Sequence, residues 1–158
     1  MKATVEWKRD MIFEGTGNVT GYPVPLDSVR SADGGSGASP MELIALGLAG
    51  CAAMDVISIL KKKQQNITGF HVEVDAPRAG EHPKVFTSAV LTYIVTGSNV
   101  DENALLRAIE LSATRYCPAH AMLSQVFPID LRYQIYEEEP NGEKHLKVQG
   151  AWQEMPQE

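Results

Sequence analysis

SPMELIALGLAGC, residues 39–51, is the stretch that decides the fold of this chain. Ser39 followed by Pro40 predicts the start of a helix, with the serine as N-cap and the proline at the first helical position. The following residues are apolar on all sides, so we expect a helix that runs to about Gln64 and is buried on most of its surface. Three lysines at 61–63 suit its C-terminus, where cations favour the helix dipole.

Shorter elements surround this helix. The expected strands span residues 3–9, 11–14, 22–26, 67–75, 85–96, 129–136 and 145–148, and further helices span 102–116 and 119–126 with a break at Pro118. This order predicts an α+β fold with antiparallel sheets. We expect a single domain over residues 1–158, with a core of about 3–148 and a C-terminal tail at 149–158. The two long helices carry more apolar surface than one small sheet covers, which favours an intertwined homodimer whose sheets wrap the central helices.

The charge balance limits the partners. A net charge of −6 disfavours nucleic acid and anionic membranes. The N-terminus lacks the apolar stretch of a signal peptide. The longest charge-free apolar run, residues 43–54, is shorter than the ~20 residues that span a bilayer. We therefore expect a soluble, cytoplasmic protein whose two cysteines are reduced at rest.

A loop of small residues, SADGGSGA at 31–38, precedes the long helix. A glycine-rich loop before a helix can cradle phosphate, but no Lys-Ser/Thr pair closes this one and the dinucleotide spacing is missing. A mobile flap is the better interpretation.

Cys51 lies about three turns into the long helix. Its neighbours on the same face are Gly47, Met54 and Asp55. An ionised Asp55 would oppose a thiolate at Cys51, so activation needs a cation from elsewhere. An inert core thiol is the alternative, because free cysteine is among the most buried residue types.

Cys117 lies at the helix break, two residues after Arg115 and three before His120. His120 could hydrogen-bond across the break, or Cys51, Cys117 and His120 could supply three zinc ligands. No second local pair of ligands supports a zinc site. We therefore expect neither a metal nor a cofactor.

Three segments carry a family resemblance. SPMELIALGLAGC at 39–51 and DVISILKK at 55–62 resemble the first helix of the OsmC/Ohr family, the osmotically inducible and organic hydroperoxide resistance proteins. YCP at 116–118 resembles its second cysteine motif. The order of elements is similar over roughly residues 3–148, and the joint pattern identifies the chain as a member.

The resemblance implies an intertwined homodimer with two active sites at its interface. It also implies a thiol peroxidase in which Cys51 attacks an organic or inorganic hydroperoxide and becomes a sulfenic acid. Cys117 then condenses with it to a disulfide, which protects the sulfur from over-oxidation. A dithiol reductant, for which a lipoyl-type dithiol is a candidate, resets the pair.

The chain departs from the family pattern around the reactive thiol. Characterised members hold the thiolate with an arginine from the N-terminal strands and a glutamate ten residues before the cysteine. Here Met41 has the glutamate position, Glu42 points about 100° away on the helix, and residues 17–21 contain no arginine. This pattern is closer to a less-characterised OsmC-like branch. The candidates for supporting the thiolate are Arg30, Glu42, Asp55 and Arg115.

Two other functions remain open at the level of sequence. One is a non-enzymatic dimer that binds an apolar small molecule, with Cys51 as a pocket residue. The other is a redox sensor whose disulfide changes the binding of a partner.

Overall fold

The computed structural model describes residues 1–28 and 37–153. The chain forms two compact units, Met1–Leu46 and Gly47–Glu158. The predicted flap over residues 31–38 lies mostly outside the described residues, and so does Arg30. The assignment of the whole chain to one domain stays a prediction.

The first unit contains an antiparallel sheet of three short strands. β1 (Ala3–Arg9) pairs with β2 (Ile12–Gly17), which pairs with β3 (Pro23–Leu26). Two prolines occur in β3, which is an edge strand and can accommodate residues without a backbone N–H donor. The apolar side chains of Val5 and Trp7 are exposed.

The long helix α1 (Pro40–Lys62) begins as the sequence predicts. The backbone N–H of Ser39 donates to the Glu42 carboxylate at 2.7 Å, and the Glu42 N–H donates to the Ser39 hydroxyl at 3.3 Å. These reciprocal bonds form a capping box. The helix ends at Lys62, and Gln64 adopts a positive φ of 56°.

The second unit is built on a four-stranded sheet. Its strands are β4 (Ile67–Asp75), β5 (Ala89–Gly97), β6 (Ile129–Glu138) and β7 (Lys144–Trp152), in that spatial order. β4 pairs with β5, and β6 with β7, in antiparallel fashion, but β5 and β6 are parallel. The prediction of purely antiparallel sheets is therefore wrong. A helical crossover joins β5 to β6, and such a crossover returns the chain in the same direction.

That crossover has three parts. α2 (Glu102–Leu111) starts after the N-cap Asp101, whose carboxylate accepts the N–H of Asn103. A π-helical turn (Ser112–Tyr116) follows, and then α3 (Pro118–Leu123). The expected helix over 102–116 is thus ten residues of α-helix and five residues of π-helix.

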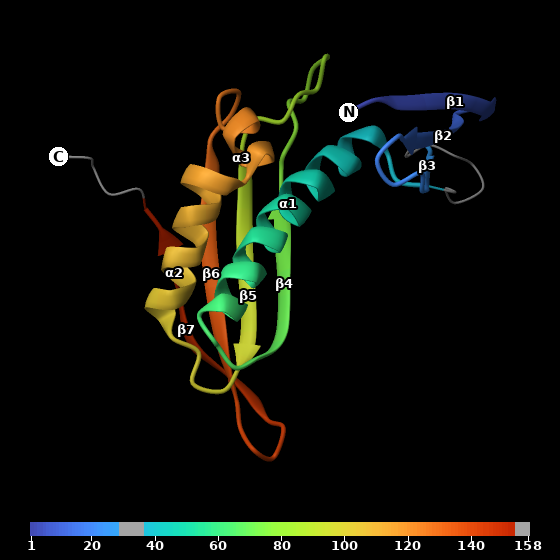
Figure 1. The fold of residues 1–158 in the computed structure, drawn as a ribbon. Coiled ribbons are helices and arrows are strands. Elements are labelled where there is room, and N and C mark those ends of the chain that lie inside the picture. The colour runs from blue at the N-terminus through green and yellow to red at the C-terminus, as the bar shows by residue number, and fades with distance from the viewer. Residues whose placement is uncertain (29–36, 154–158) are drawn as a thin grey trace. The chain divides into compact units, whose positions relative to one another are not determined.

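Helices α1 and α2 cover the same face of the four-stranded sheet (Figure 1). Buried residues alternate with half-buried ones along β5, because both faces of this central strand are partly covered. The core combines one stripe of α1, the inner face of α2 and the inward side chains of the central strands. Its main members are Leu48, Ala52, Val56, Leu60, Leu91, Tyr93, Val95, Leu105, Ile109, Leu131 and Ile135.

Strand β7 continues four residues beyond the predicted end of the core at 148. Its last residue, Trp152, pairs with Leu131 and packs against the core. Residues 149–152 of the predicted tail therefore belong to the sheet.

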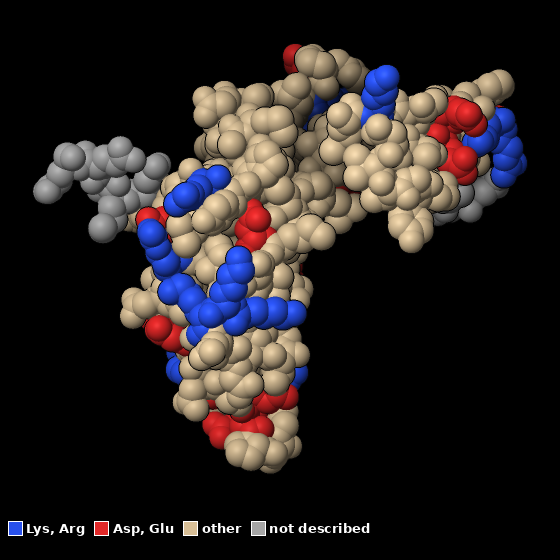
Figure 2. Space-filling model, in the orientation of Figure 1, with Lys and Arg blue, Asp and Glu red and all other residues tan. Residues whose placement is uncertain are grey.

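Helix α1 is long and apolar enough to cross a membrane by length and composition alone. This is weak evidence for a membrane span, because the core helix of a soluble protein meets the same criterion. One stripe of α1 packs in the core of the second unit. Figure 2 shows Lys and Arg side chains over its C-terminal end, where Lys61 and Lys62 lie.

Candidate functional site

The two cysteines meet in the second unit although strands β4 and β5 separate them in sequence. The Sγ atoms of Cys51 and Cys117 and a carboxylate oxygen of Asp55 all lie within 4.8 Å of one another. Both cysteines are free thiols; Cys51 is half-buried and Cys117 is buried. The structure thus brings together three residues that the sequence selects as candidates.

Helical spacing explains why Asp55 joins Cys51. The two residues are four apart on α1, so their side chains lie on one face of the helix. The same face packs against the core next to the crossover helices. Asp55 is held there by Ser112, whose hydroxyl donates to the Asp55 carboxylate at 3.2 Å. Ser112 is fully buried.

The π-helical turn delivers Cys117. The backbone N–H of Cys117 donates to the carbonyl of Ser112, five residues earlier, at 2.9 Å. Cys117 then leaves the helical conformation and becomes the N-cap of α3, where its sulfur accepts the His120 N–H at 3.3 Å. π-Helical turns are rare and occur frequently at functional sites.

The electrostatic environment of the site is unfavourable for negative charge. Burial raises the pKa of the Cys117 thiol to about 12, and the contact with the Cys51 side chain and the charge of Asp55 add to this rise. Burial also raises the pKa of Tyr93, and the negative charges of Cys117, Asp55 and Cys51 act in the same direction. No Lys or Arg of the described segments contributes to either shift.

The other predicted supporting residues lie elsewhere. Arg115 is exposed in the π-helical turn, with its guanidinium 5.5 Å from the centre of the Tyr116 ring. Glu42 belongs to the first unit, where its bonds to Ser39 hold the pKa of its carboxyl below the usual value. Arg30 is outside the described residues.

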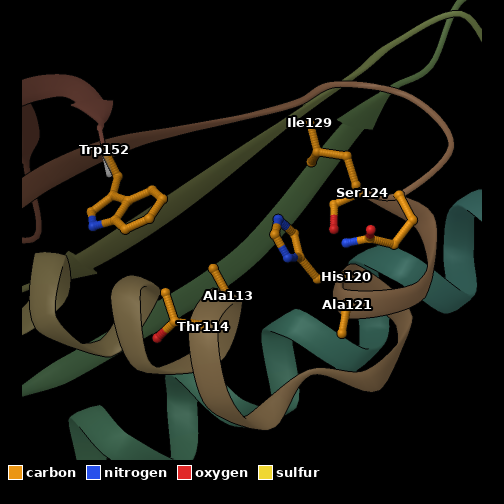
Figure 3. A pocket seen from close by; sticks show the side chains of 8 residues that line it. Ala113, Thr114, His120, Ala121, Ser124, Ile129 and Trp152 are labelled. Atoms are coloured by element: carbon orange, nitrogen blue, oxygen red, sulfur yellow. The ribbon is translucent and has the colours of Figure 1, made fainter. Parts of the chain in front are cut away.

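Two cavities each have a neighbour of the sulfurs, Asp55 or His120, in their walls. One of about 330 Å³ has Asp55, Ile59, Lys62 and Tyr116 on its wall. The other, of about 580 Å³, lies between the crossover and the end of β7. Figure 3 shows the His120 and Trp152 side chains, from α3 and β7, at this cavity together with Ala113 and Ile129.

Comparisons with known proteins agree with this architecture. Residues 33–132 match the family model described as OsmC-like protein. Protein YhfA of Escherichia coli strain K12 is 34% identical over 135 residues, which cover 85% of this chain and 98% of the relative. The chain belongs to the OsmC-like family.

Solved structures show the same fold. A hypothetical protein from Aquifex aeolicus VF5 is 25% identical and has a TM-score of 0.76. The match covers 87% of this chain and 97% of the Aquifex chain. The organic hydroperoxide resistance protein OhrB of Bacillus subtilis is 17% identical, with coverages of 84% and 98% and a TM-score of 0.57. At that identity the second likeness concerns the fold alone.

Sequence reasoning missed two residues of this OsmC-like site. Ser112 is a polar residue that continues the buried stripe of Leu105, Ala108 and Ile109, and its hydrogen bond to Asp55 reveals its role. Tyr93 looks like any core residue of an alternating strand. Ser112 keeps the α-helical register of α2, because its N–H donates to the Ala108 carbonyl, and the π-helical turn shifts only the residues after it.

Proposed function

We propose that this OsmC-like protein is a thiol-dependent peroxidase that reduces hydroperoxides as part of an oxidative or osmotic stress response. One observation carries the proposal: two free thiols from separate elements lie within 4.8 Å of each other and of a carboxylate. Small rotations of two cysteine side chains bring such sulfurs to the bonding distance of about 2.05 Å.

The first step is nucleophilic attack by Cys51. Its thiolate attacks the terminal oxygen of a hydroperoxide, the O–O bond breaks, and the products are Cys51 sulfenic acid and an alcohol after protonation of the alkoxide. Cys51 suits this role because it is half-buried whereas Cys117 is buried.

The second step joins the sulfurs. The Cys117 thiol attacks the sulfur of the sulfenic acid, a disulfide forms, and the hydroxyl departs as water with the thiol proton. With its pKa raised to about 12, Cys117 enters this step protonated. Asp55, held by Ser112, is the carboxylate within reach to take that proton and pass it to the leaving hydroxyl.

The third step restores the thiols. A dithiol reductant attacks the disulfide, forms a mixed disulfide and closes its own ring, which leaves both cysteines reduced. Fatty or aryl hydroperoxides are the proposed substrates. The cavity beside Asp55 supports this choice, because Ile59, Leu111 and Tyr116 give it apolar and aromatic walls.

We further propose that the protein acts as a soluble, cytoplasmic, intertwined homodimer. Exposed apolar side chains in both units support this: Val5, Trp7, Ile44, Leu46 and Met54. Apart from the backbone of its own helix, a Cβ at Gly47 or Gly50 would meet no atom of the described residues within 4 Å. This stripe of small residues on α1 therefore has room for the backbone of a second copy.

The test is turnover of cumene hydroperoxide with a dithiol reductant, measured for the wild type and for Cys51→Ser. We expect the variant to lose all protein-dependent turnover, because a hydroxyl cannot replace the thiolate. Ala53→Ser is the matched control, since it adds the same side chain two residues away. Equal consumption of hydroperoxide by wild type and Cys51→Ser would overturn the proposal.

A further inference from the structure

The cluster of Cys51, Asp55 and Cys117 is also a set of metal ligands. We propose that the reduced protein binds one Zn²⁺ per chain through the two sulfurs and the Asp55 carboxylate. This inference concerns binding and does not depend on peroxidase activity. It replaces the ligand set weighed from the sequence, with Asp55 in the place of His120.

The geometry suits a small tetrahedral ion. Zinc binds sulfur at about 2.3 Å and carboxylate oxygen at about 2.0–2.2 Å, so its ligand atoms lie roughly 3.3–3.8 Å apart. The three atoms here are all within 4.8 Å of one another. Side-chain rotations that move these atoms by about 1 Å would bring them to the separations of a zinc site. Cys51 and Asp55 supply two ligands from one helix face at i and i+4, and Cys117 supplies the third.

Polar groups next to the ligands are already in place. The Ser112 hydroxyl donates to Asp55 and orients the carboxylate. The His120 backbone N–H donates to the Cys117 sulfur, as it would to a metal-bound thiolate. Hydrogen bonds of this kind fix the orientation of metal ligands and tune their affinity.

Charge favours a cation at this position. Two thiols and a carboxylate converge, and no described Lys or Arg side chain lowers the pKa of the Cys117 thiol. A divalent ion would supply the missing positive charge. On binding, both thiols lose their protons to solvent and become thiolates, while the carboxylate binds as it is. Two soft sulfur ligands favour zinc over magnesium or calcium.

The fourth position is open to solvent. Cys51 is half-buried, and Asp55 lines the cavity of about 330 Å³. A water molecule can therefore complete the tetrahedron and the ion has a path of entry. Because the ion would hold both sulfurs as ligands, zinc and hydroperoxide would compete for the same thiols wherever the proposed peroxidase function holds.

The experiment uses reduced, metal-free protein. Zn²⁺ is titrated in competition with a chromophoric chelator, and Co²⁺ serves as the spectroscopic probe. We expect one Zn²⁺ per chain and a thiolate-to-cobalt charge-transfer band in the near ultraviolet. Cys51→Ser and Asp55→Asn should each weaken zinc binding by more than the ~10-fold expected for Ser112→Ala.

Surface binding is controlled by His71→Gln, because His71 and Glu73 form an exposed pair at 3.8 Å that could bind zinc adventitiously. That variant should keep the wild-type affinity. Circular dichroism confirms that each variant is folded. An absent charge-transfer band, or a zinc affinity that Cys51→Ser and Asp55→Asn leave unchanged, would overturn the inference without affecting the peroxidase proposal.

Discussion

The segments that carry the two cysteines differ in almost every structural respect. Cys51 lies in the middle of a regular α-helix and is half-buried. Cys117 lies where a π-helical turn meets a short helix, and it is buried. Under the proposed function this difference suits a division of labour, in which the regular helix presents the more accessible sulfur of Cys51 to a substrate and the buried Cys117 closes the disulfide.

The sharpest test of this division is Cys117→Ser. Without a second thiol, Cys51 should react with one equivalent of hydroperoxide and stop as a sulfenic acid, which excess peroxide oxidises further to sulfinic acid. Multiple turnover should therefore be lost while the first reaction remains. Intact-protein mass spectrometry of the wild type and the variant measures both stages. Undiminished turnover in Cys117→Ser would show that the buried sulfur has no part in the cycle.

The next largest effect is expected from Asp55→Asn. If the carboxylate carries the proton of Cys117 to the leaving hydroxyl, its loss should slow disulfide formation by up to about 100-fold. Rapid quenching followed by thiol labelling gives the rate. Asp75→Asn, an exposed carboxylate at the end of β4, is the control. Equal rates in the two variants would contradict the proton-carrying role.

A smaller effect concerns stability and pH. Burial in the folded state raises the pKa of the Cys117 thiol from 9.0 to about 12. The neutral thiol therefore favours the folded state below pH 9.0, and this contribution is lost as pH rises from there to about 12. Urea unfolding of the reduced wild type should show a steeper loss of stability across this range than Cys117→Ser. If stability falls with pH equally in the two proteins, the raised pKa of the buried Cys117 thiol would be contradicted.

The smallest effect is expected from Arg115→Ala. Its guanidinium faces the Tyr116 ring and is exposed, so we expect a change in the free energy of unfolding within about 0.5 kcal/mol. Turnover of cumene hydroperoxide should change less than twofold. A large loss of turnover with unchanged stability would instead assign Arg115 to the support of the Cys51 thiolate.

Local signals in the sequence were sufficient to predict where several helices and strands begin and end. The helix start at Ser39 and Pro40 and the strand over residues 67–75 each depend on neighbouring residues, and the structure confirms them. Family motifs selected the two cysteines, and the structure brings their sulfurs together.

The remaining features depend on contacts that a single sequence does not display. The parallel pairing of β5 with β6 follows from the path of the crossover. The π-helical turn changes the phase of the helix after Ser112 and so sets the position of Cys117. Both are tertiary results, and neither residue spacing nor helix propensity predicts them.

The crossover has one more consequence. Because β4, β5 and α2 all lie between Cys51 and Cys117, a bond between the sulfurs would close the chain into a covalent ring around half of the sheet. A ring of this size restricts the unfolded chain by about 4 kcal/mol in the chain-entropy model. Each cycle of the proposed peroxidase would thus alternate between a less stable reduced form and a more stable disulfide-bonded form of the same fold.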